Sequence, residues 1–174
     1  MISTFNTRSV YELNIPFQMH LRFDGFLGFP GGIIEENETI IEGVSREVHE
    51  EMNIDPKDLQ LTSEDFVCRA IIDKSDEKFG RSWSKLKLYF FSKEISEEAF
   101  EKMEVESRKA IHFGTEILGN IRVPVHRWRE IDGLPRFLTN AFAGTAKPQL
   151  CMALCKHNIL PKENVMEAYK MHHK

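Results

Sequence analysis

The chain has 174 residues, enough for one compact domain, and 41% of them are hydrophobic and 29% charged. This composition excludes a disordered or collagen-like protein, and no apolar run approaches the ~20 residues of a membrane span. The net charge of −4 argues against a surface built throughout for nucleic acid, and three cysteines at irregular spacing suit a reducing compartment better than a disulfide framework.

The first predicted element is a strand. Between residues 17 and 23, apolar residues alternate strictly with polar ones, which predicts a half-buried strand whose polar positions face outward. Asp24-Gly25 then turns the chain, and a short partner strand over Leu27–Phe29 ends at Pro30-Gly31-Gly32. Apolar residues at helical spacing predict an amphipathic helix over Thr39–Met52.

Strands and helices alternate through the rest of the chain. Strands are predicted over Glu64–Ile72, Leu86–Phe91 and Ile117–Val125, and the polar stretch Asp73–Ser84 is predicted to be a loop. Helices are predicted from Ser96 to about Ala110, from Pro135 to about Phe142, and over Thr145–His157 with Thr145 as N-cap. Residues 161–174 are expected to form a flexible tail. These elements predict one α/β domain over residues 1–174, a sandwich of helices and sheet.

Charge is distributed unevenly. Between Glu35 and Asp65, eleven acidic residues oppose only Arg46 and Lys57, a net charge of −9, whereas residues 121–174 carry +5. A run of acids usually marks a solvated helix face, but carboxylates gathered beside one helix also bind divalent cations.

The spacing of those acids is specific. Gly32 is followed after five residues by Glu38 and after seven more by Arg46-Glu47-Val48, and Glu50-Glu51 and Ile54 complete the stretch. This pattern resembles the signature of the Nudix hydrolases. It departs only at the last glycine, where Asn53 stands, and asparagine is the next-best residue for a left-handed helix end.

The helical geometry explains the pattern. Glu47, Glu50 and Glu51 share one face at the edge of the apolar stripe, where like charges repel unless a hard divalent cation binds them. Gly43 lies on the same face one turn earlier and is expected to leave room for metal and phosphate. Arg46 is placed to hold these carboxylates or Glu38. The resemblance implies metal-assisted hydrolysis of a nucleoside diphosphate linked to another group.

Further stretches resemble one branch of the family, the U8 snoRNA-decapping Nudix hydrolases; they are Met19–Gly32, Leu118–Pro124 and Gly133–Leu150. The resemblance runs from roughly Arg8 to Leu160 and implies the Nudix fold, an α/β/α sandwich with a mixed β-sheet. It implies removal of caps from nuclear and messenger RNA and hydrolysis of inosine and deoxyinosine diphosphates, with Mg²⁺ or Mn²⁺. It also implies a homodimer in the nucleus (nucleolus and nucleoplasm) and the cytoplasm.

The same resemblance implies a metal site made by the Gly31 carbonyl and the carboxylates of Glu47, Glu50 and Glu51, which would also be the catalytic residues. Glu116, in the loop before the strand at 117–125, is a candidate base or extra ligand, although a surface glutamate is the plainer interpretation.

Three residues are implied as nucleotide contacts: Arg22, Phe29 and Gln149. Phe29 can stack on a purine, Arg22 can meet a phosphate and Gln149 can bond a base edge. A core position for Phe29, and ordinary solvated positions for Arg22 and Gln149, fit the sequence as well.

The chain departs from this branch at two places. The resemblance implies a longer N-terminal segment that forms a first strand and supplies a histidine against the purine. We expect either that this strand is missing here or that the sequence is incomplete. A histidine expected on the strand after the signature is absent from Val67–Ala70. Both departures bear on the substrate more than on catalysis.

Three functions therefore stay open. The first is an RNA-decapping pyrophosphatase, and the second is a housekeeping diphosphatase for inosine diphosphate, ADP-ribose or similar small nucleotides. The third is a non-catalytic RNA- or protein-binding relative, of the kind known among paralogues that lost the signature. The intact Glu47, Glu50 and Glu51 argue against the third. The expected partner is capped RNA or a purine nucleoside diphosphate, with no membrane.

Overall fold

Strand β2 (Phe17–Arg22) is the strand around which the main sheet is built. β7 (Ile117–Val123) pairs with it antiparallel along its whole length. The other edge of β2 is shared by β3 (Leu27–Gly28) and β1 (Ile2–Ser3). β1 also pairs in parallel with β6 (Lys93–Glu94), so this five-stranded sheet is mixed.

A computed structural model describes residues 2–3, 17–72, 86–125 and 132–171. Within them, β4 (Phe66–Ile72) and β5 (Leu86–Phe91) form a separate antiparallel pair. The predicted strands agree closely with β4 and β5, while the loop predicted between them lies outside the described residues. No strand is expected ahead of residue 17, yet the two-residue β1 pairs there; it is too short to leave a periodic pattern.

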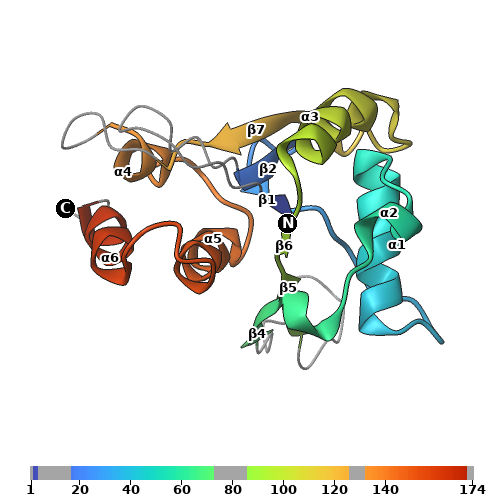
Figure 1. Ribbon diagram of the computed structural model, residues 1–174, viewed down its shortest axis with the longest axis horizontal. Coiled ribbons are helices and arrows are strands. Elements are labelled where there is room, and N and C mark those ends of the chain that lie inside the picture. Colours follow the sequence, from blue (N-terminus) through green and yellow to red (C-terminus); the bar gives the residue numbers. More distant parts are fainter. Residues whose placement is uncertain (1, 4–16, 73–85, 126–131, 172–174) are drawn as a thin grey trace, which may run out of the picture.

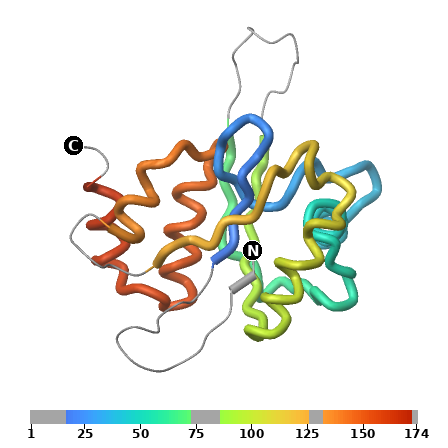
Figure 2. The backbone as a smooth tube through the Cα atoms, turned by 90° about the horizontal axis from the view of Figure 1, so that it is seen from above, coloured from blue at the N-terminus to red at the C-terminus, as the bar shows by residue number. Residues whose placement is uncertain are grey.

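The helices form two groups, one on each side of the strands (Figure 1). The helical segments are α1 (Ile40–Met52), α2 (Pro56–Leu59), α3 (Glu97–Glu106), α4 (Leu134–Phe137), α5 (Ala146–Lys156) and α6 (Lys162–Met171), with 3₁₀ turns η1 (Ser63–Asp65) and η3 (Ser107–Lys109). Viewed from above, α1 to α3 and α4 to α6 again flank the strands (Figure 2). The predicted α/β/α sandwich with a mixed sheet is confirmed.

The helix ends follow local chemistry. Thr39 caps α1 in a capping box with Glu42, and Asn53 ends the helix in a left-handed conformation with φ 55° and ψ 36°, as its sequence position predicted. Thr145 precedes α5 as predicted, although its side chain makes no capping hydrogen bond. α4 ends at Phe137, short of the predicted Phe142, because the backbone of 141–143 bonds to Leu27 instead.

The larger hydrophobic core lies between the sheet and the second group of helices. Phe17 and Met19 of β2 are fully buried there against Leu150 and Leu154 of α5. α6 adds Val165, 1% exposed, to the same core, so residues 162–171 form a docked helix in place of the predicted flexible tail. A smaller core joins α1, α2 and α3.

The opposite face of β2 is also covered. Gln18 is 2% exposed and His20 is fully buried, so the prediction that the polar positions of this strand face solvent is wrong at these two residues, whereas the Arg22 side chain is 32% exposed. α1 and α3 lie over this face, and the alternation separates an apolar layer from a polar layer inside the molecule. Within the described ranges, no helix is long and apolar enough to cross a membrane.

Candidate active site

Two carboxylates of α1 lie against the loop that follows β3. The backbone N–H of Gly31 donates to Glu51 Oε2 at 3.0 Å, and Glu51 is buried. A Cβ at Gly32 would overlap the carboxylate of Glu47, so only a glycine admits so close an approach there. Gly31 has φ +147°, which favours glycine. The structure therefore brings the predicted Gly31, Glu47 and Glu51 together.

Arg46 links these carboxylates to the preceding loop. Its Nη1 donates to Glu47 Oε1 at 2.9 Å and to Glu50 Oε2 at 3.1 Å. Its Nε and Nη2 donate to the two oxygens of Glu38, and Nη2 also donates to the Ile33 carbonyl. The prediction that Arg46 holds these acids in place is confirmed.

The surroundings of Glu47 and of Glu38 shift the pKa values of the two carboxyls in opposite directions. Burial raises the pKa of Glu47 above its usual 4.5, the neighbouring charges of Glu51 and Glu50 raise it further, and the bond from Arg46 lowers it in part. At Glu38 the hydrogen bonds from Arg46 dominate and lower the pKa. An additional cation beside Glu47 would therefore favour the charged form of this carboxylate.

Gly43 has a different role from the one expected. A Cβ at this position would lie 2.9 Å from both Glu38 Oε2 and Ile34 Cδ1. The missing side chain therefore admits the loop that carries Glu38, and the expectation that it leaves room for metal and phosphate is wrong.

The donor set suits a hard divalent cation, because it consists of carboxylate and carbonyl oxygens at the edge of a buried layer. Arg46 Nη1 lies between Glu47 and Glu50, and across the described ranges no three acidic, histidine or cysteine side chains already converge as a ligand set. A cation would compete with the guanidinium for the same oxygens.

Glu116 lies beside the last turn of α1. The N–H of His112 donates to the carbonyl of Glu50 at 3.1 Å, and Glu116 Oε1 is 3.9 Å from His112 Nδ1. The N–H of Phe23 in turn donates to the Glu116 carbonyl. The Glu116 side chain is 57% exposed, so it is accessible to solvent at the end of the helix that carries the carboxylates.

The predicted nucleotide contacts are placed on adjoining elements. Arg22 pairs with Asp24 at 3.0 Å, and a Cβ at Gly28 would lie 2.8 Å from Arg22 Cδ and 3.7 Å from Ala143 Cβ. Backbone bonds between Leu27 and residues 141–143 bring the segment before α5 beside β3. Gln149, in α5, is half-buried.

The environment of Phe29 is partly that of a core residue. Its ring centroid lies 4.8 Å from that of Phe90, and it packs on the larger core while keeping part of its surface exposed.

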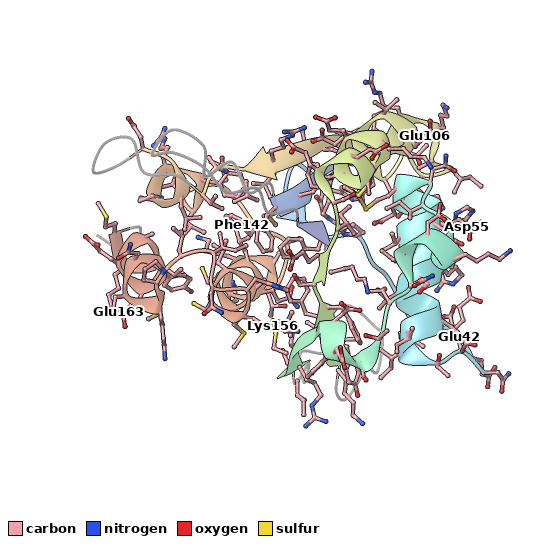
Figure 3. All side chains as sticks on the ribbon, viewed as in Figure 1. Glu42, Asp55, Glu106, Phe142, Lys156 and Glu163 are labelled. Atoms are coloured by element: carbon pink, nitrogen blue, oxygen red, sulfur yellow. The ribbon has the colours of Figure 1, made fainter. Side chains whose placement is uncertain are left out.

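Figure 3 shows Phe142 beside the strands and Lys156 near the start of β4, where its Nζ donates to the carbonyls of Glu64 and Phe66. The C-terminal end of α5 is thus bonded to the chain at the start of β4.

One polar residue at the site escapes sequence reasoning. His20 Nδ1 lies 3.6 Å from Glu51 Oε2, and both side chains are almost fully buried. His20 and Arg22 are two residues apart on β2, so their side chains point to the same face of the strand. This spacing could have placed His20 on the side of the carboxylates.

Residues 4–160 match the model of a family described as "Nudt16-like: U8 snoRNA-decapping enzyme-like". The chain belongs to the Nudt16-like family of Nudix hydrolases. It is 34% identical to the U8 snoRNA-decapping enzyme of Xenopus laevis over 158 residues, which are 90% of this chain and 71% of that protein. The fold described above is therefore a Nudix fold.

Other relatives carry two different names. The chain is 33% identical to the U8 snoRNA-decapping enzyme of Mus musculus over 78% of its own length and 66% of that protein. It is 31% identical to the Tudor-interacting repair regulator protein of Gallus gallus over 86% of its own length. The aligned part covers 45% of the length of the Gallus gallus protein. Members of this Nudix family are thus named for an enzymatic activity or for binding another protein.

Proposed function

We propose that this Nudix hydrolase cleaves a pyrophosphate bond in capped RNA with the help of Mg²⁺ or Mn²⁺. The observation that carries the proposal is the meeting of Glu47 and Glu51 with the Gly31-Gly32 backbone at the edge of a buried layer. The names of the Xenopus and mouse relatives support capped RNA as the substrate class.

The proposed metal residues are the Gly31 carbonyl, Glu47, Glu50 and Glu51. A bound divalent cation would supply positive charge against the pyrophosphate oxygens and lower the pKa of a water. Arg46 holds the carboxylates of Glu47 and Glu50 together and fixes the loop through Glu38. We assign to Glu116 the candidate role of accepting a proton at its carboxylate, supported by its exposed position beside the last turn of α1.

The proposed nucleotide contacts are Arg22, Phe29 and Gln149. The partly exposed ring of Phe29 offers a stacking surface, and Phe90 behind it fixes the orientation of that ring. The guanidinium of Arg22 pairs with Asp24 and has further N–H donors that can bind a phosphate. Gln149 would bond a base edge from α5. The junction between β3 and residues 141–143 supports a shared subsite for Arg22 and Gln149.

The second candidate is a housekeeping diphosphatase for inosine diphosphate, ADP-ribose or similar nucleotides. The absence of a histidine from Val67–Ala70 favours it, because β4 then lacks a polar group expected of the decapping branch. A third candidate, a non-catalytic RNA- or protein-binding relative, is favoured by the name of the Gallus gallus relative. The retained carboxylates of α1 argue against it.

Two further proposals rest on the resemblance of the sequence alone. They are assembly as a homodimer and action in the nucleus (nucleolus and nucleoplasm) and cytoplasm. Light scattering of the purified protein and imaging of a tagged chain test them directly.

The deciding experiment compares substrates under one set of conditions. Purified protein with Mn²⁺ is given cap-labelled RNA, the same RNA with a 5′ triphosphate, inosine diphosphate and ADP-ribose. We expect release of the cap as a nucleoside diphosphate, with a 5′-monophosphate left on the RNA, and at least a tenfold preference over uncapped RNA, roughly 1.4 kcal/mol of discrimination. Equal turnover of capped and uncapped RNA would overturn the decapping proposal and favour the small-nucleotide alternative.

The matched variants test the site itself. Glu51→Gln is expected to lower turnover at least about 100-fold, because a group that stabilises developing charge contributes several kcal/mol. Glu163→Gln, an exposed change on α6 in the other helical layer, is the control and should be fully active (Figure 3). Activity that survives Glu51→Gln undiminished would rule out the metal site.

A further inference from the structure

The layer between β2 and α1 holds polar atoms without partners. His20 is fully buried, and neither of its ring nitrogens has a hydrogen-bond partner in the described part of the chain. The same holds for both amide atoms of Gln18 and for Asn120 Oδ1. His20 lies directly opposite Asn120 across the β2–β7 pair. Because buried polar groups are nearly always bonded, an unpaired imidazole at this place needs a reason.

Glu51 presents the complementary problem. Its side chain is 5% exposed, and the hydrogen bond that the structure shows for its carboxylate is the one from the Gly31 N–H to Oε2. A buried carboxylate is poorly stabilised by one backbone donor. His20 Nδ1, 3.6 Å from that same Oε2, is a second donor within reach.

We propose that His20 is a positioning residue for Glu51. Its Nδ1–H donates to Oε2 and, together with the Gly31 N–H, fixes the carboxylate so that Oε1 is the oxygen left for a cation. The present 3.6 Å is about 0.4 Å beyond the ~3.2 Å upper limit of an ordinary N–H···O hydrogen bond, so the bond requires a shift of that size in the ring or the carboxylate. The proposal rests on the metal-dependent function proposed above and adds the residue that orients one of its ligands.

The contact also joins two parts of the fold. His20 belongs to the central strand of the sheet, whereas Glu51 lies in the last turn of α1. Side chains that orient metal-binding carboxylates in this way typically change metal affinity 10- to 100-fold when removed. A purely structural role would instead change folding stability and leave cation affinity unaltered, so the two roles have different signatures.

The test measures Mn²⁺ binding from the electron paramagnetic resonance signal of free Mn²⁺, without substrate. His20→Leu removes the donor and should weaken binding about 10- to 100-fold. His20→Asn places its amide N–H near the Nδ1 position and should restore most of the affinity. His20→Gln places its N–H near the Nε2 position and should bind as weakly as His20→Leu. Gln18→Leu, equally buried on the same strand face, is the control and should bind like the parent protein.

Thermal melting in the presence of a chelator accompanies each variant and shows that it is folded. Normal Mn²⁺ affinity in His20→Leu, with Glu51→Gln weakened, overturns the positioning role and leaves the metal site intact. Normal affinity in Glu51→Gln as well overturns the metal site and the positioning role together.

A measurement on the parent protein is independent of how the variants fold. In ¹⁵N-edited NMR spectra, His20 should carry its proton on Nδ1, with a proton shift typical of a hydrogen bond to a carboxylate. Spectra in which Nδ1 of the buried ring carries no proton would overturn the proposal even if no His20 variant can be purified.

Discussion

The guanidinium of Arg46 binds the carboxylate of Glu38 through two hydrogen bonds, from Nε to Oε1 at 2.9 Å and from Nη2 to Oε2 at 3.2 Å. Glu38 precedes α1 by two residues, so this pair attaches the loop that follows β3 to the helix. Because the same guanidinium also binds Glu47 and Glu50, the loop and the carboxylates form one hydrogen-bonded unit.

Arg46→Lys is expected to weaken this unit. A lysine ammonium cannot present the paired donors of a guanidinium, so most of the five hydrogen bonds of Arg46 are lost while the charge stays. The melting temperature should fall by about 3 °C or more, and turnover should fall with it. Arg108→Lys, an exposed change near the end of α3, is the control and should melt like the parent protein. An unchanged melting temperature in Arg46→Lys would contradict the linking role.

Glu47→Gln should raise stability at pH 7 while it removes activity. Burial raises the pKa of Glu47, so protonation of this carboxyl stabilises the folded state. This stabilisation is complete below pH 4.5 and is lost as the pH rises through the raised pKa. Glutamine resembles the protonated form at every pH. In melts with a chelator, the variant should exceed the parent protein at pH 7, and the difference should shrink toward pH 4.

Glu42 on the same helix supplies the opposite case. Its pKa is lowered by hydrogen bonds with Thr39, so its charged form is favoured in the folded state. Glu42→Gln should therefore give no increase in melting temperature at pH 7. A Glu47→Gln variant that melts below the parent protein at that pH would show that burial of the charged Glu47 does not destabilise the fold.

Cys151 should react slowly with thiol reagents. Burial raises the pKa of its thiol to about 11, against a usual 9.0. At pH 8 this leaves about 100-fold less thiolate than an ordinary cysteine has, and the thiolate is the reactive form. Alkylation followed by mass spectrometry should show Cys151 as the slowest of the three cysteines, and unfolding in urea should equalise their rates. Rapid labelling of Cys151 in the folded protein would contradict its burial.

Val165→Ala should destabilise the domain even though α6 lies near the end of the chain. Val165 is 1% exposed in the larger core, and removing two buried methyl groups costs about 2 kcal/mol. The melting temperature should fall by about 4–8 °C. Met166→Ala, at the next and 43% exposed position, should change stability by less than about 0.5 kcal/mol. Equal effects of the two changes would mean that α6 does not dock.

The parts predictable from sequence are those that local chemistry determines. The cap at Thr39, the left-handed Asn53 and the shared face of the α1 carboxylates depend on neighbours a few residues away. Burial of His20 depends on α1 and α3, which arrive from distant parts of the chain, so alternation alone suggested solvent. α6 carries a mostly polar sequence, and its helix is stabilised by packing on α5 and α4.

The same distinction explains the errors near the site. The role of Gly43 in α1 depends on the loop that packs over it. Hydrogen bonds between Glu38 and Arg46 hold that loop in place. α4 is shortened because residues 141–143 pair with β3, a contact between segments more than a hundred residues apart.

β2 presents hydrocarbon to α5 on one side and His20 to Glu51 on the other. Inserting or deleting a single residue in this strand would exchange its two faces, which would turn Phe17 and Met19 toward the carboxylates and His20 into the hydrophobic core. Packing and chemistry would be lost in the same event. We therefore expect this strand to vary among descendants of the chain by substitution, and its length to be inherited unchanged.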